Sequence, residues 1–137
     1  MVNTQQKVIL VTGASSGIGA EVAMCAAAAG WRVVVNYNSN AAGADGVADR
    51  CRELGGEAIT VQADVATDAD CRRLADTTAD AWGQIDALVN NAGTTKVCAH
   101  GDLEGLDAAD FQRIYQVNAD RKSTRLNSSH QIISYAV

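Results

Sequence analysis

The stretch TGASSGIG at residues 12–19 contains Gly13, Gly17 and Gly19 and is the part of the sequence best suited to chemistry. Glycine lets the backbone turn sharply and approach a ligand closely. An apolar run, KVILVT at 7–12, comes before it, and an alanine-rich helical segment follows. A glycine turn between a strand and a helix offers backbone N–H groups and the positive end of the helix dipole to a pyrophosphate. The context therefore predicts a dinucleotide-binding turn, with a purely structural turn as the alternative.

The choice between dinucleotides depends on the stretch NYNSN at residues 36–40. Proteins that bind NAD usually present an acid to the ribose hydroxyls about 20 residues beyond the glycines. Here no Asp or Glu lies between Glu21 and Asp45. Uncharged polar side chains leave space and hydrogen bonds for a 2′-phosphate. The sequence therefore favours NADP(H), and NAD(H) stays open as the alternative.

These stretches must be positioned by an alternation of apolar runs and helical segments. The expected strands cover residues 7–12, 31–37, 57–65 and 85–90, and the expected helices cover residues 17–29, 41–54, 67–82 and 107–119. Such alternation is typical of βαβ units. It predicts a single α/β domain with a parallel sheet.

Three further motifs follow the glycine turn along the chain. ADV at 63–65 follows the third expected strand, NNAG at 90–93 ends the fourth, and QVN at 116–118 lies in the last helix. Together with TGxxxGxG, they have the order and spacing of the short-chain dehydrogenase/reductase family, which the sequence resembles over residues 6–119. The resemblance implies a Rossmann-type doubly wound parallel sheet, truncated after the fourth strand and the helix that follows it. It also implies an NAD(P)(H)-dependent oxidoreductase of carbonyls or secondary alcohols, with 3-oxoacyl thioester reductases among the candidates.

The same resemblance implies which residues bind the cofactor. They are Gly13, Ser15, Ser16, Gly17, Ile18 and Gly19 around the pyrophosphate, Asn36, Tyr37 and Asn38 after the second strand, Asp64 and Val65 at the adenine, and Asn91, Ala92 and Gly93 after the fourth strand, where Ala92 and Gly93 pass under the ribose. Thr12 and Asn90 are expected to be structural: Thr12 would hold the glycine turn through its side chain, and Asn90 would brace the sheet.

One member of the family's catalytic tetrad, Asn118, is present, and it would bend its helix and help to place a water in the proton relay. The family's serine and its Tyr-x-x-x-Lys pair are absent, because Tyr135 is followed by only two residues. In this family the tyrosine gives a proton to the carbonyl. We therefore expect a catalytically incomplete fragment of an oxidoreductase. A non-enzymatic dinucleotide-binding or sensing module is the alternative.

Residues 120–137 differ abruptly from residues 1–119. They hold one alanine and four serines, against 24 alanines and three serines before them. Codons for DRKSTRLNSSHQIISYAV can be chosen so that they resemble a widely used short-read sequencing adapter. We therefore expect two parts: an incomplete NAD(P)-binding domain at 1–119 and a non-native, adapter-derived tail at 120–137, which is left out of fold reasoning.

Composition excludes several other classes of function. A net charge of −5 argues against nucleic acid, since phosphate binding needs clustered Lys and Arg. The sequence shows no secretory signal, no apolar run of membrane-spanning length and no lysine-rich membrane patch. The four cysteines, Cys25, Cys51, Cys71 and Cys98, form no CxxC pair, and no histidine lies at ligand spacing. We expect no metal, reduced thiols, a cytoplasmic location, a small-molecule substrate and, from the family, a homo-oligomer.

Overall fold

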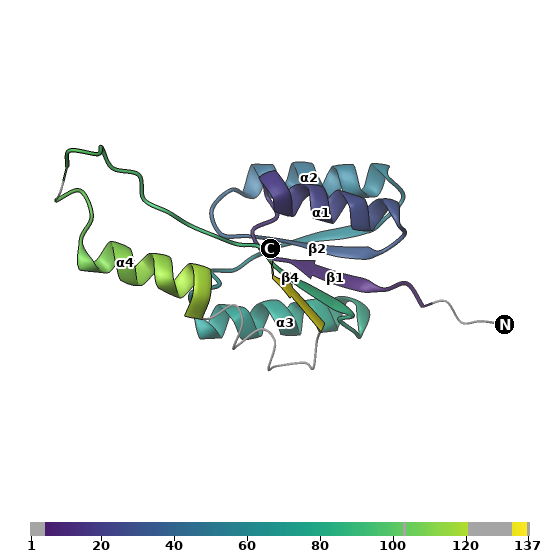
Figure 1. Cartoon of the computed structure of the whole chain (residues 1–137). Coiled ribbons are helices and arrows are strands. Elements are labelled where there is room, and N and C mark those ends of the chain that lie inside the picture. The colour runs from purple at the N-terminus through teal and green to yellow at the C-terminus, as the bar shows by residue number, and fades with distance from the viewer. Residues whose placement is uncertain (1–4, 103, 121–132, 137) are drawn as a thin grey trace.

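The computed structural model describes residues 5–102, 104–120 and 133–136 (Figure 1). In chain order its elements are β1 (Val8–Val11), α1 (Gly17–Ala28), β2 (Arg32–Tyr37), α2 (Ala41–Glu53), β3 (Glu57–Gln62), α3 (Asp68–Trp82), β4 (Ala87–Asn90), α4 (Ala108–Tyr115), a π-helical turn η1 (Gln116–Asp120) and β5 (Ile133–Ala136). Every strand and helix expected from the sequence is present, with ends that differ by a few residues.

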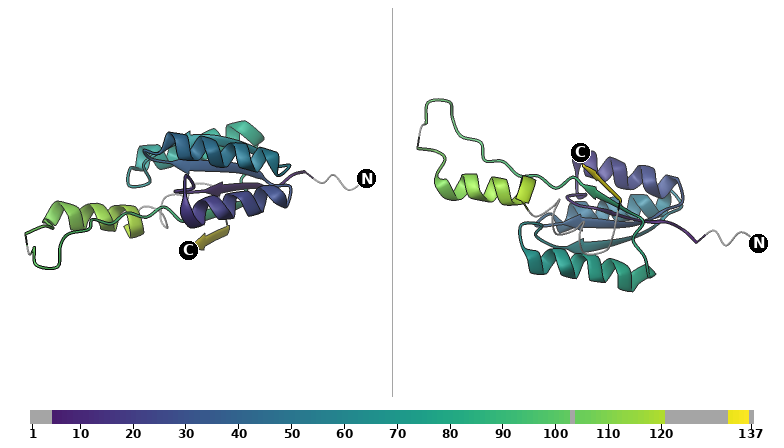
Figure 2. Two further views of the ribbon diagram at one scale, coloured as in Figure 1. Left: turned by 90° about the horizontal axis from the view of Figure 1, so that it is seen from above. Right: turned by 60° about the horizontal axis from the view of Figure 1, so that its bottom comes forward.

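The strands form one parallel sheet in the order β3-β2-β1-β4-β5. Helices α1 and α2 cover one face of the sheet and α3 covers the other, while α4 lies beyond the carboxyl ends of the strands (Figure 1, Figure 2). The strand order reverses direction at β1, which has β2 on one side and β4 on the other. Ligands of doubly wound sheets bind at this switch point, outside the carboxyl ends of the strands. The predicted Rossmann-type fold is confirmed.

Alternate residues of the central strands build two cores. Val11, Val33 and Val35 face α1 and α2, whereas Leu10 and Val34 face α3. All five side chains are fully buried. A parallel sheet covered on both faces needs such continuous apolar strands. For this reason VILV and the VVV of RVVVNY do not alternate between apolar and polar residues.

Two elements end earlier than the sequence suggests. The third strand stops at Gln62 rather than at residue 65, because the chain turns where the Asp64 carboxylate accepts the Ala66 N–H at 2.9 Å. The last helix keeps α geometry only to Tyr115 and continues as the π-turn η1, which contains Asn118. Single π-turns within helices occur often at functional sites.

The sheet does not end at the fourth strand. Residues Ile133–Ala136 pair with β4 in parallel, with Ala87 opposite Ile133 and Asn90 opposite Ala136. An edge strand offers unpaired N–H and C=O groups to any segment of strand-forming composition, and ISYA includes a β-branched and an aromatic residue. The origin of residues 120–137 from an adapter stays a prediction.

Candidate functional site

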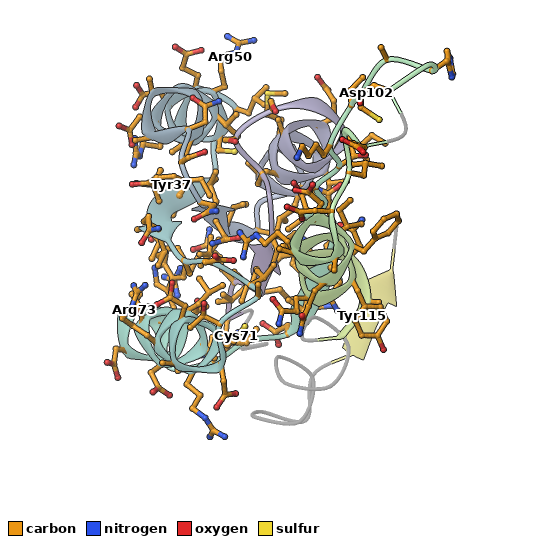
Figure 3. All side chains as sticks on the ribbon, turned by 90° about the vertical axis from the view of Figure 1, so that its left-hand side faces the viewer. Tyr37, Arg50, Cys71, Arg73, Asp102 and Tyr115 are labelled. Carbon is orange, nitrogen blue, oxygen red and sulfur yellow. The ribbon has the colours of Figure 1, made fainter. Side chains whose placement is uncertain are left out.

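A cavity of about 470 Å³ opens at the carboxyl ends of the strands. Its lining comes from the glycine turn, the loop after β2, the turn after β3, the loop after β4, and α4. The residues are Gly13, Ser15, Ser16, Ile18, Asn36, Asn38, Ser39, Asn40, Ala63, Asp64, Val65, Asn91, Ala92, Gly93, Thr94, Arg113 and Val117. Figure 3 views the molecule from this side, with Tyr37 of β2 and Tyr115 of α4 on opposite sides of the view (Figure 3).

Most of the residues predicted to bind cofactor therefore share one cavity. The exceptions are Gly17, Gly19 and Tyr37, which are not part of its lining. Gly17 is the first residue of α1 and Gly19 the third, and Tyr37 is half-buried and packs against the core under α1 and α2.

The glycine turn lies directly against the loop after β4. Gly13 has φ +61°, and a Cβ on it would lie 2.6 Å from the Ala92 Cα. A Cβ on Gly19 would collide with the Asn91 side-chain amide and lie 2.7 Å from the Gly13 carbonyl oxygen. Only glycine leaves room for this contact, so the first and third glycines bring β1, α1 and the β4 loop together.

The amino end of α1 is the end that suits an anion. Ser16 is its extended N-cap, yet among the described residues the Ser16 side chain finds no capping partner and the first turn holds no acid. By contrast, Asn40 caps α2 through the Gly43 N–H at 3.0 Å. Gly17 has φ +59°, and a Cβ there would meet no described atom within 4 Å. Uncapped N–H groups beside open space fit a pyrophosphate.

Two side chains lock the glycine turn to the β4 loop. The Thr12 hydroxyl accepts the N–H groups of Asn91 and Ala92, both at 3.0 Å, and donates to the Val89 carbonyl at 3.3 Å. The Asn91 amide donates to the carbonyls of Thr12 and Gly13 at 2.9 and 3.0 Å. As predicted, the Thr12 side chain holds the glycine turn, and it does so by bonding the loop after β4. The Asn91 amide adds two hydrogen bonds from that loop to the turn, which the sequence did not predict.

Asn36, predicted to touch the cofactor, uses its side chain inside the protein. It is 1% exposed. Its Oδ1 accepts the Gly13 N–H at 3.1 Å, and its Nδ2 donates to the carbonyls of Val61 and Ala63 at 3.2 Å each. The amide thus joins the glycine turn to the end of β3, and it shapes the cavity by fixing both segments. Asn90, expected to be structural, is buried at the end of β4.

The loop after β2 gives the cavity an uncharged polar wall. Asn38, Ser39 and Asn40 all line it and are exposed. Among the described residues of the lining, Asp64 is the only acid and Arg113 the only base. The β2 end therefore carries no carboxylate that would repel a phosphate.

Asp64 and Val65 form the turn after β3. Val65 is buried in the core under α3, and the Asp64 backbone N–H donates to the Asp70 carboxylate at 2.8 Å. This hydrogen bond, together with one from Arg73, holds the pKa of the Asp70 carboxyl below its usual range. Arg113 was not predicted as a site residue, yet its Nη1 lies 2.9 Å from Asp64 Oδ2. No sequence motif marks Arg113; only its place on the helix that carries Asn118 could have suggested it.

Asn118 clamps the loop after β4. Its Oδ1 accepts the Thr94 N–H at 2.8 Å, and its Nδ2 donates to the Thr94 carbonyl at 3.0 Å. A Cβ on Gly93 would lie 3.6 Å from that Oδ1. The predicted catalytic residue therefore lies beside the end of the NNAG motif. Thr94, which directly follows this motif, was also missed.

Two negative findings apply to the part of the chain that the structure describes. Within it, no group of three or more His, Cys, Asp or Glu side chains could hold a metal ion. Over residues 5–102, 104–120 and 133–136, no helix is long and apolar enough to cross a membrane.

Comparison with known proteins places this geometry in a family. The family model for short chain dehydrogenases matches residues 7–121. A 3-oxoacyl-[acyl-carrier-protein] reductase from Synechocystis is 50% identical over 112 residues, which cover 82% of this chain and 44% of that protein. An oxidoreductase from Methylorubrum extorquens is 42% identical over 118 residues, 86% of this chain and 46% of the relative. The chain thus spans about half the length of the curated relatives it matches.

Solved structures agree with the fold. A short chain dehydrogenase from Burkholderia cenocepacia in complex with NADP superposes with a TM-score of 0.83 at 35% identity, covering 96% of this chain and 56% of that chain. The NADH-dependent reductase A1-R′ complexed with NAD gives a TM-score of 0.78 at 30% identity, covering 92% and 51%. With the family model spanning nearly all of the sheet and helices described above, this chain belongs to the short-chain dehydrogenase/reductase family.

Proposed function

We propose that this chain is the cofactor-binding part of an oxidoreductase that uses NADP(H) to interconvert a carbonyl and a secondary alcohol. One observation carries the proposal: five segments far apart in sequence line one cavity at the switch point of the sheet, where the amino end of α1 has no side-chain cap among the described residues. When bound, the nicotinamide supplies or accepts the hydride. The protein contributes the N–H groups of α1 for the pyrophosphate and the fixed loop after β4.

The preference for NADP(H) is supported by the wall of Asn38, Ser39 and Asn40. A 2′-phosphate needs hydrogen-bond donors and no nearby carboxylate. Asn36 turns its own amide inward to Gly13, so the exposed polar groups at this end are those of residues 38–40. Similar proteins have been solved with NADP and with NAD, so NAD(H) is the alternative that the titration below tests.

A 3-oxoacyl thioester is the substrate class we propose for the whole protein, since a relative with 50% identity is a 3-oxoacyl-[acyl-carrier-protein] reductase. Asn118 remains the proposed catalytic residue. Through its two hydrogen bonds to Thr94 it fixes the loop that ends the NNAG motif. Since the sequence has no Tyr-x-x-x-Lys, we expect the 137-residue chain to bind cofactor without turning over substrate.

We further propose a cytoplasmic location and a homo-oligomeric parent protein. The four cysteines are all free thiols, which suits a reducing compartment. We propose that residues 1–119 form the native part and that 120–137 are foreign to it. Sequencing the source DNA across codons 119 and 120 tests this division, and native coding sequence identical to residues 120–137 would refute it.

Calorimetric titration of the chain with NADPH and NADH tests the proposed cofactor. We expect saturable binding of both, with NADPH tighter by about tenfold, the effect of one good charge-assisted interaction. Asn38→Asp should weaken NADPH and spare NADH, because it places a carboxylate beside the 2′-phosphate. Gln112→Glu, which adds the same charge on exposed α4 outside the lining, is the matched control. Absence of saturable binding for either dinucleotide would refute the proposed function.

A further inference from the structure

An ion pair lines the cavity, and one of its members, Arg113, has no assigned role in cofactor binding. Arg113 extends from α4, and its Nη1 lies 2.9 Å from Asp64 Oδ2 at the end of β3. The Arg113 side chain is 44% exposed and that of Asp64 25%. An ion pair this exposed contributes little to the free energy of unfolding. Both residues line the cavity, so we infer that the pair acts on ligand binding.

The carboxylate of Asp64 is fixed on both sides. Its Oδ1 accepts the Ala66 N–H at 2.9 Å, while Arg113 takes Oδ2. Its backbone is fixed as well, because the Asp64 N–H donates to Asp70, and Asp70 pairs with Arg73 at 3.0 Å. With Arg113 removed, Oδ2 would lose its described partner and the carboxylate could rotate about the remaining bond to Ala66.

The pair also sets what this end of the cavity can recognise. Arg113 neutralises Asp64, so the pair attracts neither an anion nor a cation strongly. A carboxylate can only accept hydrogen bonds, and each oxygen keeps a free lone-pair site after one bond. The complementary group is an uncharged donor, such as the exocyclic amino group of adenine. Hypoxanthine carries a carbonyl there and would face the carboxylate with a second acceptor.

We propose that Arg113 is a positioning residue that orients the Asp64 carboxylate to accept the adenine amino group, so that the cavity selects adenine over hypoxanthine dinucleotides. This inference rests on the proposed binding of NADP(H). It also gives α4 a role in cofactor binding, since Val117 on the following turn lines the same cavity and Asn118 lies next to it.

The test is a comparison of two ligands on the 137-residue chain: NADPH and the reduced nicotinamide hypoxanthine dinucleotide phosphate. We expect the wild type to bind NADPH about tenfold more tightly, one hydrogen bond to a charged group. Arg113→Met, which keeps the aliphatic stem, should reduce this ratio to about threefold or less, mainly by weakening NADPH. Arg50→Met removes an arginine from a surface ion pair with Glu53 on α2 and should leave the ratio unchanged.

The outcomes distinguish a failure of the proposed NADP(H) binding from a failure of the proposed role of Arg113. If the wild type binds neither ligand, the proposed function fails and the inference with it. If the wild type binds both equally, or if Arg113→Met keeps the full ratio while binding NADPH, the function stands and the inference is wrong. Should Arg113→Met fail to give a cooperative melt, Arg113→Lys keeps the charge and should give an intermediate ratio. A wild-type ratio in a folded Arg113→Lys would also count against the inference.

Discussion

Replacing Asn36 with alanine should destabilise the chain and weaken cofactor binding together. The side chain is buried and makes hydrogen bonds to the Gly13 N–H and to the carbonyls of Val61 and Ala63. A net contribution of about 1 kcal/mol for each bond gives a loss of about 3 kcal/mol. Since a small domain has only about 5–15 kcal/mol of unfolding free energy, this loss is a large share of the total.

The assay is urea unfolding followed by tryptophan fluorescence and far-ultraviolet circular dichroism. Trp31 and Trp82 lie on opposite sides of the sheet, packed against the two separate cores, so both cores are reported. Asn38→Ala is the matched control, since Asn38 is exposed and should change the free energy of unfolding by less than about 0.5 kcal/mol. NADPH binding should weaken in Asn36→Ala because the glycine turn loses the acceptor for Gly13.

A loss below about 1 kcal/mol in Asn36→Ala, with an unchanged dependence on urea, would refute the reasoning. It would mean that the carbonyls of β3 and the Gly13 N–H find water as readily as they find the amide. Unaltered NADPH affinity in a clearly destabilised Asn36→Ala would show instead that the turn keeps its shape without this hydrogen bond.

Three further perturbations test other parts of the site. Gly13→Ala should abolish detectable NADPH binding in calorimetry, because its Cβ would lie 2.6 Å from the Ala92 Cα at a φ of +61°; normal binding would contradict the close approach. Asp70→Asn should lower the urea midpoint at pH 6, since the pKa of Asp70 is depressed in the folded state. The ionised Asp70 carboxylate stabilises the fold above its unfolded-state pKa, and this stabilisation is lost as the pH falls through its folded-state pKa. The difference in urea midpoint between Asp70→Asn and wild type should therefore shrink below about pH 4. A difference in midpoint that does not change with pH would exclude this role of Asp70. Asn118→Ala should accelerate amide hydrogen exchange at Thr94, whose N–H it accepts, and unchanged protection of Thr94 would argue against the clamp.

The fold could be predicted closely because the strands of a parallel sheet covered on both faces appear in the sequence as short apolar runs. VILV and ALVN are buried along their whole length, and turn residues bound them. The ends of strands and helices were less predictable where a side-chain hydrogen bond to the backbone ends the element. The Asp64 carboxylate ends β3 early by bonding Ala66, and this depends on a turn rather than on a hydrophobic period.

The residues of the site were predictable at positions that require glycine. They were less predictable where side chains from different helices and strands contact one another. Gly13 and Gly19 follow from the spacing of the motif, and their contacts with Ala92 and Asn91 explain why no larger residue fits. The pair of Arg113 with Asp64 joins residues 49 positions apart on α4 and after β3, and nothing local marks it. Likewise, the inward turn of the Asn36 amide depends on the carbonyls at the end of β3, which a sequence pattern does not place.

The most direct test of a dinucleotide site at the carboxyl edge of the sheet is a nuclear magnetic resonance titration of the isotope-labelled chain with NADPH. We predict that the largest backbone amide shifts fall in the segments that form or border the cavity, at residues 13–19, 38–40, 64–65 and 91–94. Shifts concentrated instead at the opposite edge of the sheet, around Lys7, Gly30 and Gln84, or no shifts at saturating NADPH, would contradict it.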